Sequence, residues 1–169
     1  MKCIRKVFPV VVLLLTLLLT ACSAPMNYRT DLPAEEVTKA ITKEIPAESG
    51  YRPQGSDFMQ LYLKDAVPAV FDYSIVSAIA ADDYAEIGVL FVKKHEDVAT
   101  VEAAVTSYLD YFRETYTPQA QQYDPTELQK IEDATCRVYG NYVVYTILTE
   151  EDLKTVDETV KSLLSVAES

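Results

Sequence analysis

The sequence predicts an α+β fold with a four-stranded antiparallel sheet built from two hairpin-helix (ββα) repeats. We expect two long helices on one face of this sheet, plus an N-terminal helix. Three observations lead to this prediction. Two pairs of segments rich in β-branched and aromatic residues each surround a turn, an amphipathic helical pattern follows each pair, and the two units align at one offset.

The chain begins with a segment that is typical of protein export. Lys2, Arg5 and Lys6 precede an apolar run from Val7 to Leu19. This run is shorter than the ~20 residues that a helix needs to span a bilayer. It closes on Leu19-Thr20-Ala21-Cys22, which resembles the lipobox of bacterial lipoproteins.

The lipobox resemblance implies that Cys22 is the membrane anchor, because the cysteine of this motif receives a diacylglycerol before the signal peptide is cleaved. Residues 1–21 are then the signal peptide, 22–32 a lipidated flexible tether, and 33–169 a single α+β domain. The expected location is the extracytoplasmic face of the bacterial cell membrane, where the protein is lipid-anchored.

The charge of the chain restricts its partners. The formal net charge is −11, and it becomes −14 without residues 1–21, which carry three basic residues and no acidic ones. A domain this acidic is not expected to bind nucleic acid, whose phosphates require a basic surface. It is also not expected to hold anionic lipid by its net charge. The membrane lipid partner is therefore expected through the Cys22 anchor alone.

Cys136 is the one cysteine left after signal removal and lipidation of Cys22. No internal disulfide can then form. Its neighbours Ala134, Val138 and Val143 indicate a small buried hydrophobic residue rather than a reactive thiol.

The first part of the domain is predicted to be helical. Pro33 is suited to a first helical position, an apolar stripe follows it, and the helix should stop near Pro46. The segment 48–55 contains prolines and glycines and is predicted as a loop. A short helix should run from about Asp57 to Leu63.

The first hairpin-helix unit follows. Segments 74–80 and 84–92 are predicted strands around the turn Asp82-Asp83. A helix is expected from about Asp97 to Tyr116, and it should end before Pro118.

The second unit begins after a loop and short helix around residues 125–132. Strands are predicted at 135–139 and 142–148, joined by Gly140-Asn141, a two-residue hairpin turn. The last helix should run from Glu150 to about Ala167, with Thr149 and Asp152 placed as a capping box.

The two units align at an offset of 55 residues. Over positions 96–109 and 151–164, seven of fourteen residues are identical, including Thr100 with Thr155 and Ser107 with Ser162. An internal repeat covering about 74–116 and 134–167 is the first interpretation. Convergence on amphipathic spacing is the alternative, and superposition of the two segments decides between them.

The remaining face of the sheet also needs a cover, because Tyr142, Val144 and Leu148 would otherwise be exposed on it. The N-terminal helix could flank the long helices or cover part of this face. An apolar face left open would be an interaction site.

Several of these motifs resemble the DUF4358 family of small Gram-positive lipoproteins. The lipobox, the run from Asp124 to Ala134, the hairpin Val138-Tyr139-Gly140-Asn141-Tyr142-Val143, and the segment Glu86 to Lys93 carry the resemblance. It extends from about Asp57 to the C-terminus. The family has no assigned activity, so the resemblance implies a compartment and a domain shape but no catalytic residues.

Neither a metal site nor a catalytic site is predicted. His95 is the single histidine and lacks the spaced partners that zinc requires, so it is interpreted as a solvated loop residue. Asp82 and Asp83 lack the spacing of a calcium loop and are interpreted as turn residues. No nucleophile motif and no glycine cluster for phosphate binding occurs, and no cofactor is expected.

Twelve tyrosines and no tryptophan are the unusual feature of the composition. Tyr111 and Tyr116 point away from the apolar stripe of their predicted helix, and they are candidates for partner contact. The alternative is that both pack under the following loop.

We therefore expect a non-enzymatic binding or accessory module of the cell envelope, with an envelope protein as its partner. A small-ligand binding lipoprotein is the first alternative, and it would need an enclosed apolar pocket. An envelope enzyme with an unrecognised site is the second, and it would need a cleft with a strongly perturbed acid.

Overall fold

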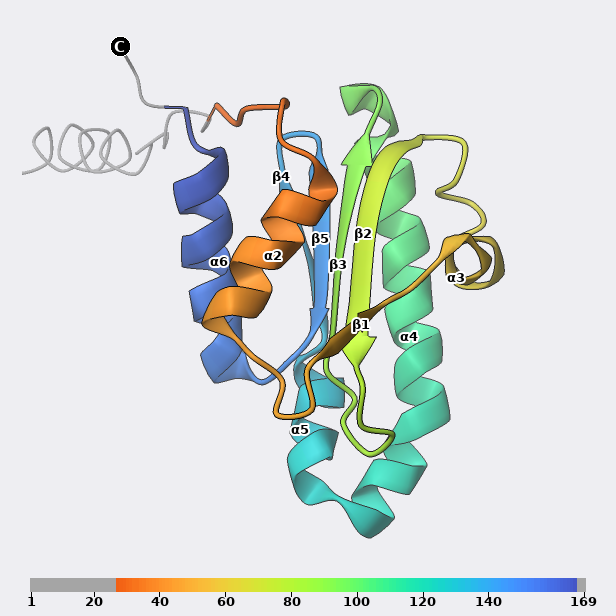
Figure 1. Cartoon of the computed structure of the whole chain (residues 1–169). Coiled ribbons are helices and arrows are strands. Elements are labelled where there is room, and N and C mark those ends of the chain that lie inside the picture. The colour runs from red at the N-terminus through yellow and green to blue at the C-terminus, as the bar shows by residue number, and fades with distance from the viewer. Residues whose placement is uncertain (1–26, 167–169) are drawn as a thin grey trace, which may run out of the picture.

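A five-stranded antiparallel sheet separates two layers of helices in the computed structural model, which describes residues 27–166 (Figure 1). The strand order is β1-β2-β3-β5-β4. The strands are β1 (Tyr51–Pro53), β2 (Val70–Ala78), β3 (Glu86–Val92), β4 (Thr135–Tyr139) and β5 (Tyr142–Ile147). The helices are α2 (Ala34–Glu44), α3 (Ser56–Tyr62), the 3-10 helix η2 (His95–Asp97), α4 (Val98–Tyr123), α5 (Pro125–Asp133) and α6 (Glu150–Leu164). The predicted α+β class is confirmed.

The central strands are apolar on both faces because their side chains alternate between two cores. Leu90 in β3 and Val143 in β5 pack in the core beneath α4. Val89 and Val144, which pair across the same two strands, pack in the core beneath α2 and α6. All six residues of β5 are buried.

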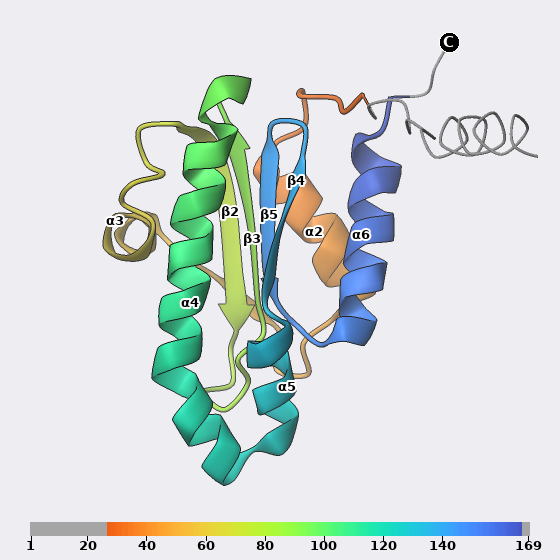
Figure 2. The same ribbon diagram turned by 180° about the vertical axis from the view of Figure 1, so that it is seen from behind.

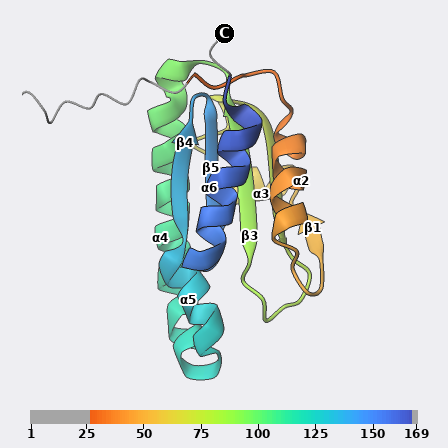
Figure 3. The same cartoon turned by 90° about the vertical axis from the view of Figure 1, so that its left-hand side faces the viewer.

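The prediction that both long helices share one face is wrong. α4 covers one face of the sheet, whereas α6 and α2 cover the other (Figures 2 and 3). The physical reason is that both faces of β3 and β5 are apolar, so each face needs its own helices. The core beneath α2 and α6 includes the three apolar residues that would otherwise be exposed, Tyr142, Val144 and Leu148.

The strand count and the repeat also differ from the prediction. β1 is a fifth strand within the segment predicted as a loop, and it pairs with the end of β2 from Tyr51↔Ala78 to Pro53↔Val76. Three residues are too few to give a periodic signal, and Pro53 is tolerated because β1 is an edge strand. A rotation that superposes the hairpin β2-β3 on β4-β5 leaves α4 and α6 on opposite faces. The alignment at 55 residues therefore does not correspond to a repeated ββα unit.

Helix α4 passes through Pro118, although the sequence predicted that it would end before this residue. Proline removes one helical hydrogen bond. The last turn is nevertheless held, because Ala120 is buried in the core and its carbonyl accepts a bond of 2.8 Å from the Asp124 amide. α6 ends at Leu164, three residues earlier than predicted.

The hairpin turn between β4 and β5 forms at Gly140-Asn141, as predicted. Gly140 has a φ of +61°, and Asn141 is not in the left-handed region. Positive φ at the first central residue alone corresponds to a type II′ turn, in which glycine is preferred.

The segment predicted as a tether is described from Asn27 onwards, and there it contacts the domain. The Asn27 carbonyl accepts a 3.0 Å hydrogen bond from the amide of Val166, and the amide of Arg29 donates one of 2.8 Å to Leu164. The hydroxyl of Tyr142 donates to the Leu32 carbonyl at 2.7 Å. These bonds join residues 27–32 to the end of α6 and to β5.

Candidate functional site

The four lipobox residues, Leu19, Thr20, Ala21 and Cys22, lie outside the described residues. Lipidation of Cys22 therefore stays a prediction. Between residues 27 and 166, no helix has both the length and the apolar character that a membrane span requires.

Aromatic rings form a continuous belt on the α4 face of the sheet. Neighbouring rings lie 4.5 to 6.1 Å apart and are mostly tilted or edge-on, which is the favourable arrangement for aromatic pairs. This aromatic belt consists of Phe58, Tyr62, Tyr84, Tyr108, Tyr111, Phe112, Tyr116 and Tyr145.

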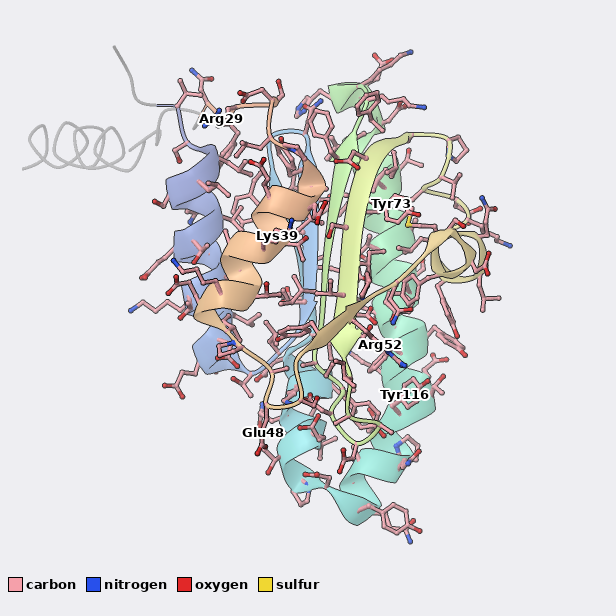
Figure 4. All side chains as sticks on the ribbon, in the orientation of Figure 1. Arg29, Lys39, Glu48, Arg52, Tyr73 and Tyr116 are labelled. Atoms are coloured by element: carbon pink, nitrogen blue, oxygen red, sulfur yellow. The ribbon has the colours of Figure 1, made fainter. Side chains whose placement is uncertain are left out.

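The structure places the two predicted contact residues differently. Tyr111 lies at one end of the belt, 5.9 Å from the ring of Tyr62, and is 49% exposed. Tyr116, which Figure 4 labels on α4, is half-buried, and its ring centroid lies 4.5 Å from that of Phe112 and 5.3 Å from that of Tyr84. Tyr111 is thus available to a partner, whereas the ring of Tyr116 packs on Tyr84 in the turn segment between β2 and β3.

A groove of about 430 Å³ lies between α3 and the first half of α4. α4 contributes Ala104, Ser107, Tyr108 and Tyr111, whose spacing of three and four residues places them on one face of the helix. The other side is formed by α3 and the residues after it, Leu61, Tyr62, Leu63, Lys64 and Asp65.

The lining of the groove combines apolar and charged side chains. Leu61 is 70% exposed and Tyr62 is 37% exposed, and the ring of Tyr62 lies beside that of Tyr111. Lys64 and Asp65 add one charge of each sign to the lining. We call this surface the α3–α4 groove.

The wall of the α3–α4 groove is connected to a buried carboxylate, Glu86, through Tyr108. Glu86 Oε1 accepts hydrogen bonds of 2.8 Å from the hydroxyls of both Tyr108 and Tyr145, and Oε2 accepts one of 2.7 Å from Ser77. Burial raises the pKa of Glu86, and the three hydroxyl donors partly offset this effect. Within residues 27–166, no lysine or arginine forms a salt bridge with it.

No motif in the sequence distinguishes Glu86 from the other acidic residues. The available signal was its alternation with Ala85 and Ile87, which placed Glu86 on the second face of β3 together with Leu90 and Val92. Once that face is covered by α4, a glutamate there must be buried and must find donors.

Gly88 makes the packing of Tyr145 possible. A Cβ atom on Gly88 would lie 1.9 Å from the ring of Tyr145 on the adjacent strand β5. Because Tyr145 is fully buried and donates to Glu86, its ring cannot move aside without breaking that bond.

A second cleft, of about 630 Å³, lies at the end of the molecule that contains the β2-β3 turn and α5. Two of its acidic side chains, Asp83 and Glu127, share a basic partner. Lys130 binds Asp83 at 2.8 Å and Glu127 at 2.6 Å, while the amides of Tyr84 and Ala85 donate to these two carboxylates. The Lys130 pKa is raised by these contacts although burial opposes the rise. The interaction fixes the turn to α5, which agrees with the turn interpretation of Asp83.

His95, Cys136 and Thr149, the other residues considered from the sequence, lie in surroundings that favour no chemistry. His95 is exposed, and its Nδ1 lies 3.2 Å from Oδ1 of Asn141. No group of three or more metal-ligating side chains occurs in the part of the chain that the structure describes. Cys136 is half-buried, and burial raises the pKa of its thiol to about 12, so the thiolate is disfavoured. Thr149 donates to Asp152 at 2.7 Å, but its side chain caps no amide of α6.

Comparison with known proteins adds one finding. No curated protein and no solved structure matches the chain. A family model described as a domain of unknown function, DUF4358, matches residues 68–148. The matched segment runs from the loop before β2 to the residue after β5, so it includes Glu86, Gly88 and the α4 side of the groove. This match supports the DUF4358 family for this chain, a family to which no function is attached.

Proposed function

We propose that this protein is a lipoprotein of the Gram-positive cell envelope, anchored at Cys22 on the extracytoplasmic face of the membrane. In this proposal it acts as a non-enzymatic binding or accessory module, and the α3–α4 groove is its contact surface for an envelope protein. The observation that carries the proposal is that Leu61 and Tyr111, both strongly exposed, line the same groove. Exposed apolar side chains that are grouped in this way are typical of interaction sites.

The chemistry of the groove favours a protein segment as the partner. Tyrosine provides a large apolar contact area together with a hydroxyl that can form a hydrogen bond, and it is enriched among residues that dominate binding energy. Tyr62 and Tyr108 pack against each other with ring centroids 5.5 Å apart, so the wall of the groove is ordered before a partner binds. A partner segment with one or two apolar side chains and flanking charges of both signs would match this surface.

The anchor would strengthen such binding. Attachment at Cys22 would confine the domain to a thin layer next to the membrane, which raises its effective concentration toward partners in that layer. A modest contact area could then be sufficient for function.

Site-specific photocross-linking in living cells tests the groove. A photoreactive amino acid at position 111 of the full chain should cross-link to one discrete envelope protein. The same amino acid at position 123 is the matched control, because Tyr123 is a 73% exposed tyrosine at the far end of the same helix. Leu61→Ser should reduce the yield at position 111 about tenfold, by loss of one apolar anchor.

Three outcomes would count against the proposed contact surface. They are equal cross-linking at positions 111 and 123, no protein cross-link at 111, and an unchanged yield in Leu61→Ser. A cross-link at position 111 to a small molecule alone would replace the protein partner with a ligand, for which a groove of about 430 Å³ has the right size.

The anchor has its own test. Cys22→Ala should abolish metabolic labelling by fatty acid and leave an uncleaved precursor, because the thiol is the acceptor. Normal cleavage of this variant, or labelling that persists, would contradict lipidation at Cys22.

A further inference from the structure

We propose that the end of the domain that carries Phe71, Lys93 and Lys94 rests on the surface of the membrane that holds the anchor. We call it the proximal end. This inference depends on the proposed lipidation of Cys22, and it adds a second membrane contact and a fixed orientation.

The length of the connection gives the first argument. Asn27 is hydrogen bonded to Val166 at 3.0 Å, and the ring of Tyr28 packs edge-on against Tyr139 at 5.8 Å. Only residues 23–26 separate Cys22 from this attached segment. Whatever their conformation, they allow a Cα separation of at most about 18 Å between Cys22 and Asn27.

The attachment point lies at one end of the long axis of the molecule. Arg29 and the end of α6 lie at this end, together with the start of α4, whereas Glu48 and α5 lie at the opposite end (Figures 1 and 4). α4 has 26 residues and therefore extends over about 39 Å. The short connection thus keeps the proximal end next to the lipid, and an upright domain carries the opposite end far above it.

The proximal end has the side chains that suit a membrane surface. Phe71 is 70% exposed, and its ring packs edge-on against the ring of Phe91 with 6.1 Å between the centroids. Lys93 and Lys94 are exposed near it, since the Lys93 amide donates to the Ala69 carbonyl at 3.0 Å, and Lys94 Nζ lies 3.5 Å from a carboxylate oxygen of Glu96. An aromatic ring with adjacent lysines is the combination by which interfacial segments contact anionic lipid.

The proximal end carries charges of both signs, with Asp31 beside Arg29 and Glu96 beside Lys94, whereas the cleft at the opposite end is mainly acidic. The cleft at the opposite end is lined by Glu48, Asp82, Asp83, Asp124, Glu127 and Asp152, with Lys130 as its single basic residue. An anionic membrane repels this end. In the upright orientation the acidic end lies several Debye lengths of about 8 Å away, so the repulsion is screened. The overall negative charge is therefore compatible with local contact at the proximal end.

Tryptophan fluorescence on vesicles tests the orientation, because the chain contains no tryptophan. Residues 22–169 with Cys136→Ser are coupled through the Cys22 thiol to a maleimide lipid. The vesicles contain phosphatidylcholine and phosphatidylglycerol with brominated acyl chains. Phe71→Trp should then be quenched about twofold, since an interfacial indole reaches the brominated chains. Tyr123→Trp is the control at the opposite end, and it should keep its full emission.

The lysines are tested in the same system. Adding Lys93→Glu and Lys94→Glu to the Phe71→Trp protein should remove most of the quenching. Lys154→Glu is the control and should not, because Lys154 is an exposed lysine in the first half of α6, away from the proximal end. No quenching at position 71, or equal quenching at 71 and 123, would overturn the proposal. The chemical coupling replaces biological lipidation, so failure of the anchor in cells and failure of this orientation are separate results.

Discussion

The two faces of the sheet are covered by side chains of different chemical character. The face under α4 is aromatic and has a buried carboxylate, Glu86, whose hydrogen-bond donors are the hydroxyls of two tyrosines and one serine. The face under α2 and α6 is mainly aliphatic. Its carboxylate, Asp157, lies at the border of the core and binds Lys161 at 2.7 Å and the Tyr139 hydroxyl at 2.8 Å.

The surroundings of these two carboxylates shift their pKa values in opposite directions. Burial raises the pKa of Glu86, and hydroxyl donors alone do not reverse the shift. Burial also acts to raise the pKa of Asp157, but its hydrogen bonds from Lys161 and Tyr139 outweigh this effect, and the pKa is lowered. The α4 face is therefore the one where a small change of volume or polarity should have the larger effect, and it is also the face that borders the α3–α4 groove.

Gly88→Ala should give the largest loss of stability. Its Cβ would overlap the ring of Tyr145 at 1.9 Å, and that buried ring has no space to move. We expect the free energy of unfolding to fall by about 3 kcal/mol or more, at the upper end of overpacking effects. Urea denaturation followed by circular dichroism measures it.

Gly55→Ala is the matched control, because a Cβ at this position would meet nothing within 4 Å. It should change the free energy of unfolding by less than about 0.5 kcal/mol. Equal effects of the two substitutions would show that the close approach of Tyr145 to Gly88 does not limit the packing of this face.

Glu86→Leu should have the next largest effect. It removes the acceptor of the Tyr108, Tyr145 and Ser77 hydroxyls, and leaving buried donors unpaired costs about 2–4 kcal/mol in total. Asp157→Leu on the other face should cost less, about 1–2 kcal/mol, because Lys161 and Arg137 can turn toward solvent and only the Tyr139 hydroxyl loses its acceptor. A larger loss for Asp157→Leu would contradict the contrast between the faces.

The local elements of the fold could be predicted from the sequence, because their signals are local. The apolar stripe of α2, the strands β3 to β5 and the turn at Gly140 were placed within a few residues of their observed positions. The face on which each helix packs was not predictable in the same way. β3 and β5 are apolar on both sides, so their alternation does not indicate which face receives α4 and which receives α6.

The candidate groove was predictable only in part. Helical spacing showed that Tyr111 and Tyr116 both leave the apolar stripe of α4. It could not show that Tyr84, from the segment before β3, packs on Tyr116 and leaves Tyr111 open. The contribution of Leu61 and Tyr62 depends on α3 lying beside α4, which is a contact between segments distant in the sequence.

Substitutions of Tyr116 and Tyr111 should differ in their effect on stability, by less than the substitutions of Gly88 and Glu86. Tyr116→Ser should lower the free energy of unfolding by about 1–2 kcal/mol, because it removes ring contacts with Phe112 and Tyr84. Tyr111→Ser should change it by less than about 0.5 kcal/mol. Comparable losses would show that Tyr111 is part of the core rather than of a contact surface, and thermal unfolding of the two variants distinguishes these cases.

The smallest expected effect is a difference in pH dependence between the faces. The Glu86 pKa is higher in the folded state than its usual value of 4.5, so the folded protein binds more protons between these two values, and stability falls as the pH rises through that window. Glu86→Gln should remove this fall.

The Asp157 pKa is lower than its usual value of 3.8. The stability that Asp157 contributes is therefore present above pH 3.8 and is lost as the pH falls below it. Asp157→Asn should remove that loss. Melting temperatures of the two variants and the wild type across both windows test the contrast. It is refuted if the wild type gains stability over Glu86→Gln as the pH rises above 4.5, since burial of the carboxylate would then not control its ionisation.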